Sequence, residues 1–151
     1  MTAKIAEISN SANPVNCRVE ALKLTGFRNY KSLSLTLDAR PIVLTGRNGA
    51  GKTNLLEAVS FLCDGRGLRR AGYQEIIQHP VGTNTENTAL SGSAGWAVWG
   101  RLTGPNGQVE IGTGSGSFAP DAGENRRTVR IDGVTARSLN ELADYSRIIW
   151  L

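Results

Sequence analysis

The residues with the clearest chemical potential in this chain are eight consecutive positions that match the pattern GxxxxGK[ST]. Glycines in this pattern allow successive backbone N–H groups to point at phosphate oxygens. The lysine reaches the β- and γ-phosphates, and the last hydroxyl binds a Mg²⁺ ion that bridges two phosphates. The sequence therefore predicts a nucleoside triphosphate site, with Thr53 as the Mg²⁺ ligand. The predicted site residues are Gly46, Arg47, Asn48, Gly49, Ala50, Gly51, Lys52 and Thr53.

The elements that must position this loop are predicted on both sides of it. Residues 42–44 (Ile-Val-Leu) lack polar alternation, which predicts a strand buried on both faces in the centre of an α/β sheet. After the loop, Leu55, Val59 and Leu62 recur at helical spacing, and Asp64-Gly65 predicts the end of that helix. A glycine-rich turn without a ligand is the alternative, but the strand and the helix favour the nucleotide site.

The rest of the chain is patterned mainly as short strands. Period-two alternation and Asn-Gly or Asp-Gly turns predict two hairpins, and Ser138 with Glu141 predicts a capping box for a short helix. The predicted strands cover residues 19–24, 33–37, 96–102, 108–111 and 129–131.

Composition limits the class of protein. The chain has 151 residues and carries 17 Lys plus Arg against 13 Asp plus Glu, a net charge of +4. Apolar runs are too short for a membrane span, no secretory leader is visible, and Cys17 and Cys63 are too isolated to predict a zinc framework or disulfide scaffold. Length alone suggests about one domain, and the composition favours a cytoplasmic protein. Residues 1–16 are expected to be a flexible extension, and residues 17–151 the folded part.

Two segments resemble the RecF family, in the structural-maintenance-of-chromosomes (SMC) branch of ABC-type ATPases. They are Leu22–Tyr30 (LKLTGFRNY) and Thr45–Glu57 (TGRNGAGKTNLLE). Asn54 is also as that family has it, and Gly65–Arg70 lies where the family carries its own Gly-Arg segment. The resemblance is weaker in the second half of the chain.

The resemblance implies a fold and a function. It implies an α/β P-loop NTPase fold, a partial ABC/SMC-type ATPase head with a mixed sheet and an antiparallel β lobe from about residue 90. It implies ATP-dependent binding to DNA, preferentially single-stranded or gapped, in DNA replication, recombinational repair and the SOS response. ATP and Mg²⁺ are the implied cofactors. An ATP-dependent homodimer of the full-length protein and other recombination-repair proteins are the implied partners.

The same resemblance nominates five further residues. Arg28 and Asn29 are expected to contact the nucleotide. The basic cluster of Arg66, Arg69 and Arg70 could bind DNA phosphates, since each such contact adds salt-dependent affinity. Alternatively, these three arginines are solvated loop charges or pair with Glu75.

Features that the family uses for hydrolysis do not follow the loop in this sequence. No hydrophobic strand ends in adjacent carboxylates after Lys52, and Asp132 is followed by glycine, as in a hairpin turn. The Walker B acid and the signature segment are thus missing, and no complete catalytic set is predicted. We expect the chain by itself to bind ATP weakly at best and to hydrolyse essentially none.

Other functions stay open at this point. Another DNA-metabolism ATPase head, SMC-like or from phage defence, is one alternative; SMC proteins carry long heptad arms that the RecF family lacks. A small P-loop kinase would transfer a γ-phosphate to a metabolite without a partner subunit. A DNA-binding module that never needed ATP would bind DNA equally with ATP, ADP or no nucleotide.

Aromatic and basic residues in the second half have plainer interpretations. Trp96, Trp99 and Trp150 could stack on bases, but core or hairpin packing is favoured. Arg126-Arg127 and Arg130 lie near the second hairpin, where solvated charges are favoured over DNA contacts.

Overall fold

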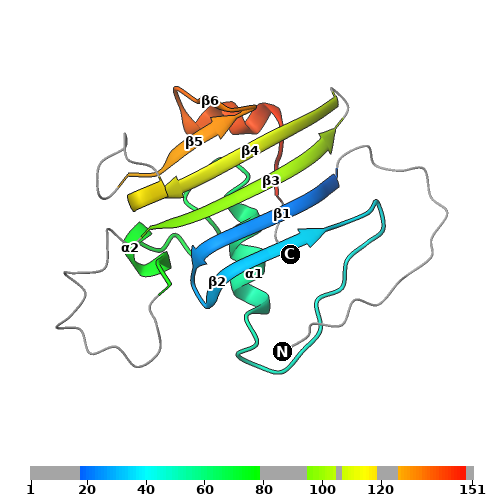
Figure 1. The fold of residues 1–151 in the computed structure, drawn as a ribbon. Helices are drawn as coiled ribbons and strands as arrows, with labels where there is room; N and C mark the ends of the chain where they lie inside the picture. Colours follow the sequence, from blue (N-terminus) through cyan, green and yellow to red (C-terminus); the bar gives the residue numbers. More distant parts are fainter. Residues whose placement is uncertain (1–17, 79–94, 105–106, 119–125, 149–151) are drawn as a thin grey trace.

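The computed structural model describes residues 18–78, 95–104, 107–118 and 126–148 (Figure 1). In this part of the chain, six strands form one sheet in the order β2-β1-β3-β4-β5-β6, and every neighbouring pair is antiparallel. The predicted extension over residues 1–16 lies outside the described residues. The elements are β1 (Arg18–Phe27), β2 (Tyr30–Thr36), α1 (Lys52–Ser60), α2 (Tyr73–Ile76), β3 (Trp96–Gly104), β4 (Gly107–Ser115), the 3-10 helix η2 (Gly116–Phe118), β5 (Thr128–Ile131), β6 (Val134–Thr135) and the 3-10 helix η4 (Leu139–Asp144).

One face of the sheet is buried and the other is open. Along β3, Trp96, Val98 and Leu102 are buried, whereas the alternating residues Trp99 and Arg101 are only half-buried. This alternation follows from the period of two in a strand, which sends successive side chains to opposite faces. Helix α1 packs on the buried face, behind the strands in Figure 1.

An aromatic cluster joins the sheet to the end of α1. The Trp96 ring lies 4.9 Å from that of Phe61 and 5.7 Å from that of Phe27, and both Phe27 and Trp96 are fully buried. The Trp96 Nε1 donates to the Tyr73 carbonyl at 3.1 Å, so its one polar atom is satisfied. Trp96 is therefore a core residue, as predicted, while Trp150 lies outside the described residues.

The C-terminal end of α1 is held by an arginine from the other half of the chain. Arg127 donates from Nη2 to the Phe61 carbonyl at 2.5 Å and from Nη1 to the Gly65 carbonyl at 2.7 Å. Its Nε donates to Thr113 Oγ1 at 2.7 Å, and its guanidinium lies over the Phe61 ring. Burial lowers the pKa of Arg127 to about 10, so it is still a cation at neutral pH. The prediction of a solvated charge is therefore wrong for Arg127, whose guanidinium is hydrogen-bonded to the end of α1 and to Thr113.

Replacing Arg127 by methionine is expected to lower the free energy of unfolding by about 1.5–3 kcal/mol, because carbonyls near the end of α1 lose a charged donor. Arg130→Met is the matched control, because Arg130 is exposed on β5 and its loss should change stability by less than about 0.5 kcal/mol. Urea unfolding of both variants measures the difference. Equal midpoints for the two variants would show that Arg127 does not hold α1.

Both predicted hairpins are confirmed. Strands β3 and β4 pair from Trp96↔Ser115 to Gly104↔Gly107, and β5 pairs with β6 across Asp132-Gly133. The capping box is confirmed too, although the helix that it starts, η4, is a 3-10 helix. These features depend on neighbouring residues, which is why a local pattern is sufficient to predict them.

The predicted strand before the loop is wrong for the described structure. Residues 42–44 form no strand; Ile42 is 43% exposed and Val43 36% exposed, and Leu44 alone has β-bridge geometry. The described sheet is consequently antiparallel rather than mixed, and β3 to β6 continue the β1–β2 sheet instead of forming a separate lobe. A strand that is apolar on both faces is stable only within a sheet that is covered on both faces. No described strand pairs with residues 42–44, so they are not part of the described sheet.

The helix after the loop is confirmed, but its buried face differs from the prediction. Helix α1 ends at Ser60, before Leu62, and its buried residues are Glu57, Ala58 and Ser60. Leu55 and Val59 are only partly buried against the core. Glu57, which the predicted stripe did not include, is buried, and its carboxylate pairs with Arg28 of the β1–β2 turn.

Candidate functional site

The predicted phosphate loop has the backbone conformation that its glycines permit. Gly46, Gly49 and Gly51 have φ angles of +146°, +82° and +94°, in the region where a Cβ is disfavoured. At Gly51 there is a second reason for glycine, because a Cβ there would lie 2.5 Å from Asn29 Nδ2. The loop therefore turns tightly into α1, with its residues from Gly46 to Ala50 exposed.

The start of α1 faces this loop without a side-chain cap. The helix begins at Lys52, and its first turn contains no acidic residue. The first N–H groups of a helix lack partners within the helix and carry partial positive charge. The arrangement favours an anion at this end of α1, and Thr53 is exposed there as the second helical residue.

A tyrosine from β2 fixes the carbonyl at the helix start. Tyr30 Oη donates to the Gly51 carbonyl at 3.2 Å, and the Leu55 N–H donates to the same oxygen at 2.9 Å. Burial raises the pKa of the Tyr30 hydroxyl above its ordinary value, which keeps it protonated as a donor.

Lys52 bends over the loop that precedes it. Its Nζ donates to the carbonyls of Gly46 at 2.6 Å and Arg47 at 2.9 Å. An ammonium group has three N–H bonds, so two hold the loop closed and the third can serve a phosphate. The Lys52 side chain thus places a positive charge at the loop and stabilises the loop conformation through these two hydrogen bonds.

The two residues nominated from the β1–β2 turn are placed differently. Arg28 Nε and Nη2 donate to the two carboxylate oxygens of Glu57 at 2.9 Å each, and Nη1 donates to the Glu75 carbonyl at 2.8 Å. Arg28 would thus reach a nucleotide only by leaving Glu57. Asn29, by contrast, lies against Gly51 at the loop itself.

Glu57 is the central residue of the site, and sequence reasoning noted it only as a family match. Its side chain is 1% exposed and is held by Arg28 and by Arg69 Nη1, which lies 3.4 Å from Oε2. Both oxygens of this buried carboxylate are therefore compensated by cations, as a buried charge requires. Glu57 lies on the side of the helix opposite the predicted stripe of Leu55, Val59 and Leu62, so hydrophobic spacing gave no signal of its burial.

The basic cluster separates into two kinds of arginine. Arg69 Nη1 donates to Asn54 Oδ1 at 3.0 Å and pairs with Glu57, close to the start of α1. Arg66 and Arg70 are exposed, and within residues 18–78, 95–104, 107–118 and 126–148 neither side chain has a hydrogen bond or ion pair. The predicted alternative of pairing with Glu75 is not seen among these residues; only the Glu75 backbone is used, by Arg28.

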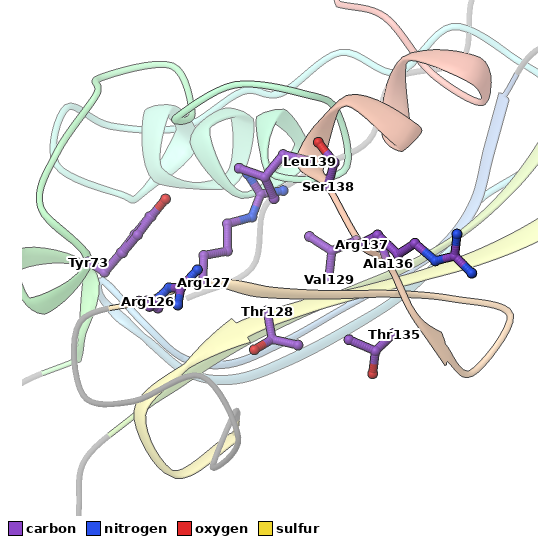
Figure 2. Close-up of a pocket in the computed structure, with 10 residues that line it drawn as sticks. All are labelled: Tyr73, Arg126, Arg127, Thr128, Val129, Thr135, Ala136, Arg137, Ser138 and Leu139. Atoms are coloured by element: carbon purple, nitrogen blue, oxygen red, sulfur yellow. The ribbon is translucent and has the colours of Figure 1, made fainter.

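Apart from the phosphate loop, the structure has a concavity between β5 and the start of η4. Arg127, one of its lining residues, reaches the end of α1 opposite the loop. Figure 2 shows Arg127 extending across the concavity toward α1, while Arg137 points away. None of its described lining residues is an acid, a histidine or a cysteine, so it lacks a general acid or base of these types. The lining residues are Tyr73, Arg126, Arg127, Thr128, Val129, Thr135, Ala136, Arg137, Ser138 and Leu139.

Among the described residues, no three His, Cys, Asp or Glu side chains gather as a metal site. None of the described helices is long and apolar enough to traverse a bilayer.

Comparisons with known proteins agree on one family. The sequence model of the RecF/RecN/SMC N terminal domain matches residues 18–144. The DNA replication and repair protein RecF of Mesorhizobium japonicum is 45% identical over 138 residues, which is 91% of this chain and 33% of that protein. RecF of Rhizobium meliloti is 47% identical over 130 residues, which is 86% of this chain and 31% of that protein. The chain thus spans about a third of the length of these relatives.

A solved structure has a similar fold. It is described as the recombination mediator protein RecF-ATP in the RecFOR pathway, and it superposes with a TM-score of 0.61 at 19% identity. The match covers 84% of this chain and 30% of that one. The predicted fold class, the head of an SMC-type P-loop ATPase, is confirmed, with the sheet corrected as described above.

Proposed function

Because the chain belongs to the RecF/RecN/SMC N terminal domain family, we propose that residues 46–53 bind the triphosphate of ATP. The observation that carries this proposal is the geometry of the loop: three glycines at positive φ, an uncapped helix start and the Lys52 ammonium all lie together. This combination suits a phosphate chain, because backbone N–H groups and a cation stabilise it jointly. Thr53 would contribute its hydroxyl to a bound Mg²⁺.

The proposal extends to the longer protein by way of the relatives. We infer ATP-dependent binding to single-stranded or gapped DNA during replication, recombinational repair and the SOS response, in the cytoplasm, by an ATP-dependent homodimer that works with other recombination-repair proteins. Residues 17–151 would be the N-terminal part of the ATP-binding head. Further chain would supply the Walker B acid and the signature segment.

Individual residues take proposed roles within this scheme. Asn29 would lie next to the bound phosphates. Arg28 would not contact the nucleotide directly, because it is paired with Glu57. The exposed Arg66 and Arg70 are the better candidates for DNA phosphates, since Arg69 already has protein partners. A rival use of the same loop is a small P-loop kinase.

Isothermal titration of the 151-residue chain tests the nucleotide site directly. We expect magnesium-dependent heat with ATP, of low affinity, and none with adenosine, because the loop binds phosphates. In parallel, release of phosphate should stay at the background rate, since no hydrophobic strand pattern after Lys52 ends in adjacent carboxylates that could orient the attacking water. Absence of any heat from a folded chain would refute the site, and turnover that is lost on Lys52→Ala would refute the expected inactivity. Transfer of phosphate to a metabolite would favour the kinase.

A further inference from the structure

A line of hydrogen bonds runs from the basic cluster to the phosphate loop. Arg69 Nη1 donates to Asn54 Oδ1 at 3.0 Å, and Asn54 Nδ2 donates to Asn29 Oδ1 at 2.8 Å. Asn29 Nδ2 then lies against Gly51, being the nearest atom to the position where a Cβ would be. Three elements contribute one residue each: the loop after α1, α1 itself and the β1–β2 turn.

The direction of this line is set by the chemistry of its first member. A guanidinium can only donate hydrogen bonds, so the Asn54 amide must turn its oxygen toward Arg69 and its NH₂ group toward Asn29. Asn29 must in turn present its oxygen to Asn54, which leaves its own NH₂ group at Gly51. With either amide reversed, two donors would face each other. Within residues 18–78, 95–104, 107–118 and 126–148, Asn29 Nδ2 donates to no acceptor.

We propose that Arg69 is a positioning residue of the nucleotide site: it orients the Asn54 and Asn29 amides so that Asn29 presents N–H groups, not an oxygen, to the bound phosphates. The inference rests on the proposed function and deepens it. It assigns Arg69 to nucleotide affinity rather than to nucleic-acid phosphates, which separates it from Arg66 and Arg70.

The ion pair with Glu57 is not the main contact of the Arg69 side chain. Arg28 already engages both oxygens of Glu57 at 2.9 Å, whereas Arg69 approaches one of them at 3.4 Å. The Arg69 side chain is also 41% exposed, so its ion pair is partly screened by water. The shorter contact of Arg69 is the one to Asn54. Its removal should therefore disturb the amides more than the fold.

The test compares Arg69→Met with Arg70→Met in the full 151-residue chain. Both changes remove one positive charge from the same loop, but only the first removes the donor to Asn54. We expect Arg69→Met to weaken MgATP binding about tenfold, on the order of one charge-assisted hydrogen bond. Arg70→Met should change it less than about twofold, and Arg69→Lys, which keeps a donor-only cation, should restore most of the affinity.

Two further measurements separate positioning from a general structural role. The thermal midpoint of Arg69→Met should match that of Arg70→Met. The side-chain amide signals of Asn29 and Asn54 in a ¹⁵N spectrum without nucleotide should move in Arg69→Met and stay in Arg70→Met. Equal losses of ATP affinity in both variants, or no rescue by Arg69→Lys, would overturn the inference and leave the nucleotide site standing. Failure of the unmodified chain to bind MgATP would refute the proposed function, and this inference with it.

Discussion

Glu57→Leu should lower the free energy of unfolding by about 3–5 kcal/mol, the usual cost of removing one partner from a buried ion pair. Glu57 is 1% exposed, and the Arg28 side chain that it holds is only 18% exposed. Loss of the carboxylate leaves the largely buried Arg28 guanidinium without its counter-charge. Because Arg28 also ties the β1–β2 turn to α2 through the Glu75 carbonyl, the damage should spread to that turn.

A double variant distinguishes the lost pair from simple loss of packing. Glu57→Leu combined with Arg28→Met removes both charges and replaces them with apolar side chains of similar length. We expect this combination to recover most of the stability lost in Glu57→Leu, since an apolar pair can replace a buried ion pair at little cost. Urea unfolding provides the free energies. A double variant as unstable as the sum of the single variants would contradict the account of Glu57.

Lys52→Ala should weaken MgATP binding by about tenfold to a hundredfold, the range for losing a charged hydrogen bond to phosphate. The lysine also holds the Gly46 and Arg47 carbonyls, so its loss opens the loop as well as removing charge. Stability should change little, because the loop is exposed and those carbonyls can be hydrated.

Lys31→Ala is the matched control for this prediction. Lys31 is an exposed residue of β2, and its removal changes the net charge by the same amount. Titration calorimetry should show nearly unchanged ATP affinity in Lys31→Ala. If the two lysine variants lose ATP affinity to the same extent, Lys52 does not bind the phosphates directly.

Local patterns predicted the local parts of the fold. The pairing of β3 with β4, the Asp132-Gly133 turn and the Ser138 capping box each depend on residues within a few positions of one another, and each forms. The glycine spacing of the loop before α1 belongs to the same class, because its conformation is set by the residues themselves.

Contacts between residues far apart in the sequence could not be predicted from local patterns. Glu57 and Arg28 are 29 positions apart, and Arg127 donates to Phe61 across 66 positions. Hydrophobic spacing indicates that a helix has a buried face but not which cation will reach a charge on it. Residues 42–44 are a different case. Their apolar pattern predicted a buried central strand, but the sequence pattern does not show which elements pair with a segment or cover its faces. In the described structure they lie outside the sheet, and Ile42 and Val43 are exposed.

The central claim is that main-chain N–H groups and Lys52 at residues 46–53 bind a triphosphate. The most direct measurement is a two-dimensional ¹⁵N amide spectrum of the chain, recorded while MgATP is added. The account predicts saturable shifts confined to residues 46–53, the first turn of α1 and Asn29, with the signals of β4 and β5 unmoved. Unchanged loop signals at high MgATP, or shifts gathered instead around Arg127 in the distant concavity of Figure 2, would contradict it.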